Sequence, residues 1–143
     1  MTTPETNRWS LALLLLRCVP GLVFLSEGFQ KFLFPQELGE GRFAKIGFPH
    51  PGFWASLTGG FEIGCGFLLI VGLLTRWASI PLLVVMGVAF ATTKWPELMN
   101  KGFWVFAHDY RTDFSMTLTL IAILLLGGGG WSLDKKRGKT NGR

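Results

Sequence analysis

The chain has 143 residues, of which 49% are hydrophobic and only 16% are charged, and its formal net charge is +5. Soluble domains carry about 25% charged residues. This composition, with a mean hydropathy of +0.38, therefore excludes an ordinary soluble protein and indicates a membrane protein, and the length allows one domain.

Four apolar blocks follow one another along the chain, at about residues 9–34, 53–74, 77–93 and 113–130. Most of them approach the roughly 20 residues that a helix needs to cross the hydrocarbon of a bilayer. We therefore expect an all-α membrane protein, built as an antiparallel bundle of four transmembrane helices over residues 9–134. Residues 1–8 and the basic tail 135–143 are expected to lie in the cytoplasm.

The first block, LALLLLRCVPGLVFLSEGFQKFLF at residues 11–34, contains three charged residues. Arg17 and Lys31 share one face of a helix, and Glu27 lies beside that face, four residues before Lys31. A charge inside the bilayer is costly, so this face is expected to contact other helices. A cleaved signal peptide is the alternative, but an arginine within the run and the lack of a small-residue cleavage site after Leu25 argue against it.

The second block contains a single acid, Glu62. At 1.5 Å per residue, Arg17 lies roughly 12 Å deep when the first helix enters the membrane at Trp9. The second helix, descending from Phe53, brings Glu62 to nearly the same depth. We therefore predict an ion pair between Arg17 and Glu62 on antiparallel neighbouring helices. The pair either fixes the register of the helices or forms part of a polar binding pocket.

Two further features of these blocks allow more than one interpretation. Cys18 and Cys65 are expected at similar depth, either as small buried apolar residues or as a redox-active pair. Gly60 and Gly64 form a GxxxG step, which suits helix packing within the bundle as well as dimerisation into a homo-oligomer.

The third block, WASIPLLVVMGVAFATT at residues 77–93, is the shortest and contains Pro81. Proline is tolerated near the first turn of a helix, so a full crossing is expected. An interfacial or re-entrant segment is the alternative.

The stretch HDYRTD, residues 108–113, precedes the fourth block and is expected at the height of Lys31 and Glu27. Asp109 and Asp113 are either acids of a functional site or signals for the start of a helix. Both His50 and His108 are expected in outer loops, which excludes a haem held by two histidines within the bundle. Their spacing matches no metal-ligand signature, and no metal site is assigned, although one built from both histidines stays open.

The distribution of lysine and arginine favours cytoplasmic termini by a small margin. The cytoplasmic side then holds seven basic residues: Arg8, Arg76, Lys135, Lys136, Arg137, Lys139 and Arg143. A basic tail just after a membrane helix is explained by anionic lipid, so no nucleic-acid partner is needed. The expected location is the cytoplasmic (inner) membrane of a bacterium or archaeon.

Several motifs occur in order along the chain: Arg17, GFQK at 28–31, GFP at 47–49, GGFEIGCGFLLIVGLLTRWAS at 59–79 and GGGGWSLD at 127–134. Together they resemble the DoxX family of small four-helix membrane proteins, from about residue 12 to 134. The resemblance implies that the family's characteristic polar positions are held by Arg17, Lys31, Glu62, Thr75 and Arg76. In two departures, Asp113 stands where a glutamate is expected and GGGG lacks the usual proline.

The family takes its name from a membrane subunit of a thiosulfate:quinone oxidoreductase, and many bacterial members carry a general oxidoreductase label. More distant relatives act as cargo receptors or assembly factors, so the fold does not fix the chemistry. The sequence carries no haem, flavin or nicotinamide motif and no iron–sulfur spacing. A redox role therefore requires a quinone or a partner redox subunit.

We expect a quinone or a small substrate to bind in a polar pocket between the first, second and fourth helices. The candidate catalytic residues are Glu62, Arg17, His108 and Asp109. The candidate binding residues are Arg17, Lys31, Glu27, Glu62, Asp113 and Arg111. The alternative functions are a non-catalytic module that binds or transports a small molecule or holds a partner enzyme, and direct chemistry on a small substrate.

Overall fold

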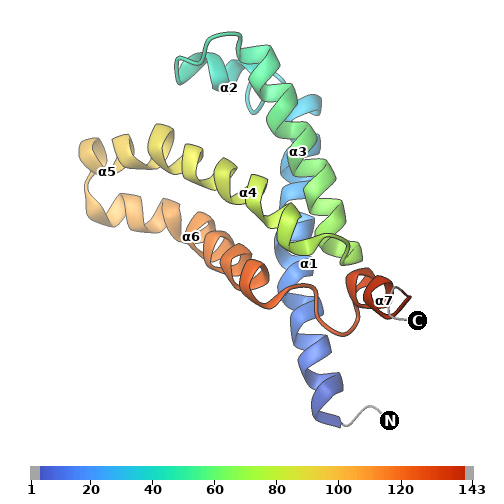
Figure 1. The fold of residues 1–143 in the computed structure, drawn as a ribbon. Coiled ribbons are helices and arrows are strands. Elements are labelled where there is room, and N and C mark those ends of the chain that lie inside the picture. The colour runs from blue at the N-terminus through green and yellow to red at the C-terminus, as the bar shows by residue number, and fades with distance from the viewer. Residues whose placement is uncertain (1–3, 141–143) are drawn as a thin grey trace.

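The computed structural model describes residues 4–140, with side chains described up to residue 136, and every regular element in that part of the chain is a helix (Figure 1). The elements are α1 (Pro4–Leu33), α2 (Glu40–Lys45), α3 (Pro51–Val71), α4 (Thr75–Ala89), the π-helix η1 (Phe90–Lys94), α5 (Trp95–Lys101), α6 (Phe103–Leu126) and α7 (Leu133–Thr140). The side chains of Arg137 and Lys139, and all of Arg143, lie outside the described part.

Three helical stretches of the described chain are long and apolar enough to cross a membrane: Pro4–Leu33, Pro51–Val71 and Thr75–Lys101. This confirms an all-helical protein with several spans. The third stretch joins α4, η1 and α5 into one rod, and Pro81 is accommodated within α4. Helix α6 has 24 residues but carries Asp109, Arg111 and Asp113 in its first half, so it does not have the apolar character of the other three.

Helices α1 and α3 form an antiparallel hairpin that is held close by glycines. Gly21 packs against Gly66, and Gly28 packs against Gly59. A Cβ atom on Gly28 would lie 2.8 Å from the Gly59 carbonyl oxygen, closer than carbon and oxygen can approach. Only residues without a side chain allow this approach, which also fixes the register of the two helices.

The GxxxG step identified in the sequence lies on another face of α3. Gly60 and Gly64 are exposed, and a Cβ atom on either would meet no atom within 4 Å. The glycines that bring α3 onto α1 are therefore Gly59 and Gly66, and Gly60 and Gly64 play no part in that contact.

The rod of α4, η1 and α5 forms a second antiparallel hairpin with α6. Gly102, whose φ of +86° favours glycine, ends α5, and α6 begins at Phe103. Aromatic rings of α6 pack across the hairpin on Phe90: the ring of Tyr110 lies 5.3 Å from it, and the ring of Phe106 lies 6.3 Å from it. This packing explains why the fourth helix begins well before residue 113.

The expectation that HDYRTD precedes the fourth helix is therefore wrong. His108, Asp109 and Asp113 all lie within α6. The two aspartates do not mark the start of a helix, and His108 does not lie in a loop. His50 does lie at the end of a connection, as the residue before α3.

The two hairpins meet at one end and diverge toward the other (Figure 1). Where they meet, Leu69, Leu82, Leu120 and Ile123 are at most 1% exposed and form the centre of the core. Elsewhere large apolar side chains face outward, including Trp77, which is 72% exposed, and Trp104, which is 83% exposed. This exposure of large apolar side chains on the outer surface suits contact with lipid.

The glycine contact between α1 and α3 yields a prediction for stability. We expect Gly28→Val to lower the free energy of unfolding by about 1–3 kcal/mol, because the added carbons collide with the α3 backbone. Gly60→Val is the matched control, since it places the same side chain on the open face of the same hairpin. Thermal unfolding of both variants in detergent measures the difference, and equal melting temperatures would contradict the close packing.

Candidate functional site

A buried ion pair joins α1 to α3 within their membrane-spanning parts. The Lys31 ammonium lies 2.7 Å from a carboxylate oxygen of Glu62. Lys31 is 9% exposed and Glu62 is 3% exposed. In a helix each side chain leans toward the N-terminus of its own helix, so on antiparallel neighbours these two side chains lean toward each other.

The predicted ion pair between Arg17 and Glu62 is wrong. Arg17 lies beside Gly72, at the far end of α3, and Glu62 is about 15 Å away along the helix axis at 1.5 Å per residue. Arg17 also lies on the other side of Glu62 from Lys31, so the lean of each side chain toward its own N-terminus moves Arg17 and Glu62 apart. The depth estimate failed because it assumed where each helix enters the membrane rather than how the two helices pack.

The buried guanidinium of Arg17 binds backbone carbonyls instead of a carboxylate. Arg17 is 2% exposed, and its two terminal nitrogens donate to the carbonyl oxygens of Gly128 and Trp131. These carbonyls belong to the glycine-rich turn after α6. Arg17 therefore ties the first helix to the segment that follows the last long helix.

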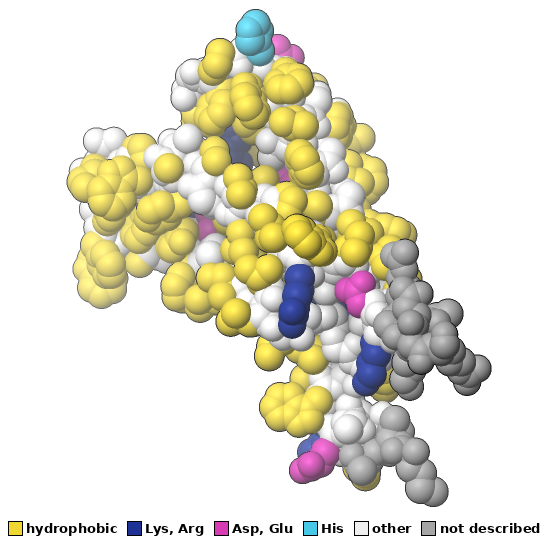
Figure 2. All heavy atoms as spheres, viewed as in Figure 1, with side chains coloured by type: hydrophobic (Ala, Val, Ile, Leu, Met, Phe, Trp, Pro, Cys, Tyr) yellow, Lys and Arg dark blue, Asp and Glu magenta, His cyan; other side chains and the backbone are white. Residues whose placement is uncertain are grey.

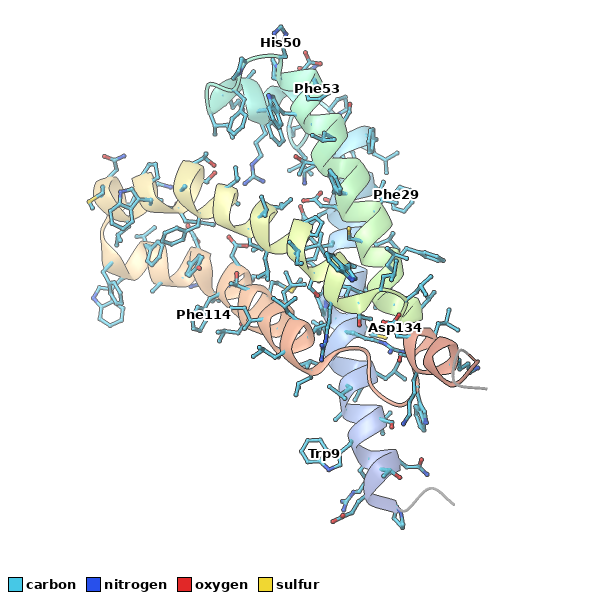
Figure 3. The ribbon with its side chains drawn as sticks, in the orientation of Figure 1. Trp9, Phe29, His50, Phe53, Phe114 and Asp134 are labelled. Carbon is cyan, nitrogen blue, oxygen red and sulfur yellow. The ribbon has the colours of Figure 1, made fainter. Side chains whose placement is uncertain are left out.

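Asp134, a residue that the sequence analysis did not single out, completes this end of the fold. Its carboxylate accepts hydrogen bonds from the Leu74 amide at 2.7 Å, the Thr75 amide at 3.1 Å and the Thr75 hydroxyl at 3.1 Å. It thereby caps the N-terminus of α4 from α7. Figure 3 labels Asp134 at this end, whereas His50 and Phe53 lie at the opposite end of α3. Asp134 is the last residue of the GGGGWSLD motif, which marks it in the sequence. The motif does not reveal that its carboxylate binds Leu74 and Thr75.

A small cavity of about 130 Å³ lies beside the Lys31–Glu62 pair. It is lined by Lys31, Phe32, Pro35, Glu40, Gly52, Ala55 and Ser56. Glu27 and Arg42 are charged neighbours of Glu62. The ammonium of Lys31 forms its ion pair with Glu62 rather than with Glu27. Glu27 of α1 and Arg42 of α2 thus lie near the buried pair, which makes a group of four charged side chains with Lys31 and Glu62.

The charged residues of α6 form a separate group on the other hairpin. Lys94 of η1 lies 3.7 Å from Asp113 and 3.9 Å from Glu97, and it donates to the Asp109 carbonyl at 3.1 Å. Arg111 bonds to the ring of His108, and both are exposed. Because the hairpins diverge, the structure does not join these residues to Lys31 and Glu62 in the expected pocket between the first, second and fourth helices.

The two cysteines and the possible metal site are the remaining candidates from the sequence. Cys18 is half-buried and Cys65 is buried, and both are free thiols. Cys65 is next to Gly66, which packs on Gly21 and Leu25, so it lies more than one helical turn from the level of Cys18. Within the described residues, no three histidine, cysteine or carboxylate side chains are grouped so as to hold a metal ion.

Comparison with known proteins identifies related sequences. The sequence model of the DoxX family matches residues 12–95. An uncharacterised membrane protein of Mycobacterium tuberculosis is 50% identical over 130 residues, which cover 87% of this chain and 80% of that protein. No solved structure matches the chain. The family match ends before the glycine-rich turn, but it includes both partners of the buried ion pair.

The contact between Arg17 and the glycine-rich turn yields a second prediction. Arg17→Met removes both donors, and the two carbonyls then lack hydrogen bonds that are worth about 1–3 kcal/mol to a buried group. We expect hydrogen exchange of the amides in residues 127–134 to accelerate by about tenfold or more, because the turn opens locally. Arg8→Met, a change to an exposed arginine of the same helix, is the control. Unchanged exchange in the Arg17 variant would contradict the assigned role.

Proposed function

The chain belongs to the DoxX family of membrane proteins, and we propose that it is the membrane subunit of a quinone-linked oxidoreductase. The proposed quinone site is the Lys31–Glu62 pair with the adjoining cavity of about 130 Å³. The buried ion pair is the observation that carries the proposal.

An ion pair at this position is costly to maintain. Desolvating two charges within an apolar hairpin is repaid only in part by their attraction, and apolar side chains of similar volume often give equal or greater stability. Ionisable groups within membrane spans are accordingly taken as candidates for a functional site. A role in binding and in handling protons explains why Lys31 and Glu62 are charged.

The chemistry of the pair suits a quinone headgroup. The ammonium of Lys31 can donate a hydrogen bond to a quinone carbonyl, and the carboxylate of Glu62 can accept a proton. A cavity of about 150 Å³ accommodates benzene in another protein, so a cavity of about 130 Å³ is of the size of a single ring. Phe29 and Phe32, which are 51% and 50% exposed, offer an apolar surface for the isoprenoid tail.

Oxidation of a quinol to a quinone releases two electrons and two protons. We assign one proton to Glu62 and the other to Glu40, which lines the same cavity and is exposed. The sequence provides no haem, flavin or nicotinamide motif of its own, so the electrons pass to a partner redox subunit. Arg17 and the α6 residues His108, Asp109, Arg111 and Asp113 are left out of this site, because their contacts are elsewhere.

We further infer that the chain crosses the membrane four times, with both termini in the cytoplasm. Helix α6 runs antiparallel to the Thr75–Lys101 rod and returns to the end at which α4 begins. Asp134 lies just after α6 and caps α4, so α6 crosses back if the rod crosses. The basic residues at this end favour the cytoplasmic side.

Quinone binding tests the proposed function. We expect the protein in phosphatidylcholine nanodiscs to bind ubiquinone-1 or menadione, measured by titration calorimetry. The double variant Lys31→Met/Glu62→Met should weaken binding by about tenfold or more, which corresponds to about 1.4 kcal/mol. The double change is used because removing one partner leaves a buried charge unpaired and costs about 3–5 kcal/mol of stability.

The controls separate binding from folding. Glu37→Gln, on an exposed carboxylate outside the cavity, should leave quinone affinity unchanged. The double variant should retain the melting temperature of the wild type. Absence of quinone binding in the wild type, or full binding in a folded double variant, would overturn the proposal and favour a non-catalytic module.

The topology has its own test. In a cysteine-free background, Glu5→Cys and Lys136→Cys should react with a membrane-impermeant maleimide from the same side of oriented vesicles. Lys45→Cys should react only from the opposite side. Labelling at positions 5 and 136 from opposite sides would show an odd number of crossings and contradict the four-helix topology.

A further inference from the structure

A second, larger cavity lies at the end of the molecule where the α3–α4 turn, the glycine-rich turn and α7 meet. Its volume is about 600 Å³, and it opens to the outside of the protein. The residues that matter for its chemistry are Arg76, Trp77, Ser132, Asp134, Lys135 and the glycines at 127–130. Its volume falls in the range of small-molecule sites, about 300–1,000 Å³.

Among the described residues the cavity carries a net positive charge, because Arg76 and Lys135 outnumber the single carboxylate, Asp134. Arg76 donates one hydrogen bond, at 3.0 Å, to the Leu125 carbonyl, and a guanidinium has five N–H groups. Neither Arg76 nor Lys135 forms an ion pair with another described residue. Asp134 also lines the cavity, but its two oxygens already accept from two backbone amides and the Thr75 hydroxyl. Two cations therefore remain available to an anionic ligand.

The rim of the cavity is apolar. Leu74 is 46% exposed and Trp77 is 72% exposed. Outward-facing side chains of α4 and α6, among them Ile80, Val84 and Leu125, continue from this rim along the second hairpin. Tryptophan is enriched where a membrane span meets the headgroups. Figure 2 shows basic and acidic side chains at this end, with hydrophobic side chains beside them.

We propose that this cavity binds the headgroup of an anionic phospholipid. The lipid phosphate lies between Arg76 and Lys135, glycerol oxygens meet Ser132 and the glycine-rich turn, and the acyl chains follow the apolar face of α4 and α6. A free phosphate would satisfy the two cations but would leave the apolar rim and most of the volume unused. A zwitterionic lipid brings its own cation, so it gains less from a cavity of net positive charge.

The site is independent of the proposed quinone site. The Lys31–Glu62 pair is on the first hairpin, and Glu62 is about 15 Å along α3 from Gly72, which lies at the end near this cavity. A bound lipid here would hold the α3–α4 turn against α7, next to the contact of Arg17 with the glycine-rich turn. Loss of this site should therefore leave quinone binding intact.

Native mass spectrometry of the full chain tests the proposal. The protein is released from nanodiscs made of phosphatidylcholine alone or of an equimolar mixture with phosphatidylglycerol, and the retained lipids are counted. We expect one phosphatidylglycerol to be retained preferentially. Arg76→Gln/Lys135→Gln should weaken that retention by about tenfold or more, because both cations that attract the lipid phosphate are removed. Lys45→Gln/Lys101→Gln, which removes two exposed lysines from the opposite end, should not weaken it.

A single variant and a competition with inorganic phosphate complete the test of lipid binding. The Lys135 side chain forms no hydrogen bond or ion pair with the described residues. Lys135→Gln alone should therefore weaken retention in a protein that melts as the wild type does, which covers failure of the double variant to fold. Inorganic phosphate should not displace the lipid. Equal retention of both lipids, full retention by the Lys135 variant, or displacement by inorganic phosphate would each overturn the proposal.

Discussion

The buried ion pair between Lys31 and Glu62 imposes the strongest constraint on this protein. Two charges can lie in an apolar hairpin only if each finds the other at hydrogen-bond distance, and this in turn demands an exact register between α1 and α3. Gly28 and Gly59 supply that register, because their backbones approach more closely than any side chain would allow. The sequence thus combines a costly polar contact with the small residues that make the contact possible.

The opposite end of the fold is organised by different chemistry. Arg17 binds carbonyls of the glycine-rich turn, and Asp134 caps α4. These contacts link α1, α4 and the segment after α6 at one end of the molecule, while the outer ends of the two hairpins diverge (Figure 1). The protein therefore has a tied end and an open end. The Lys31–Glu62 pair lies toward the diverging end, and the cavity near Arg76 lies at the end where the hairpins meet.

Composition and block length were sufficient to predict a helical membrane protein, and the ordered motifs were sufficient to identify its family. The partners of the charged residues were not predictable in the same way. Arg17 and Glu62 match in estimated depth, but the contacts of Gly21 with Gly66 and of Gly28 with Gly59 set a register that places Arg17 beside Gly72. The start of α6 was also placed too late, because the packing of Phe106 and Tyr110 against Phe90 is a tertiary contact that outweighs the polar character of the segment around His108.

The proposed function requires that a quinone reach the Lys31–Glu62 pair from the bilayer. Photolabelling with an azido-quinone, followed by peptide mass spectrometry, measures this most directly. The label is expected on two stretches that line the small cavity: residues 31–35, at and just after the end of α1, and residues 52–56 of α3. Excess unlabelled quinone should suppress this labelling. Labelling confined to the α4–α6 hairpin, or labelling that unlabelled quinone does not suppress, would rule out a quinone site at this pair.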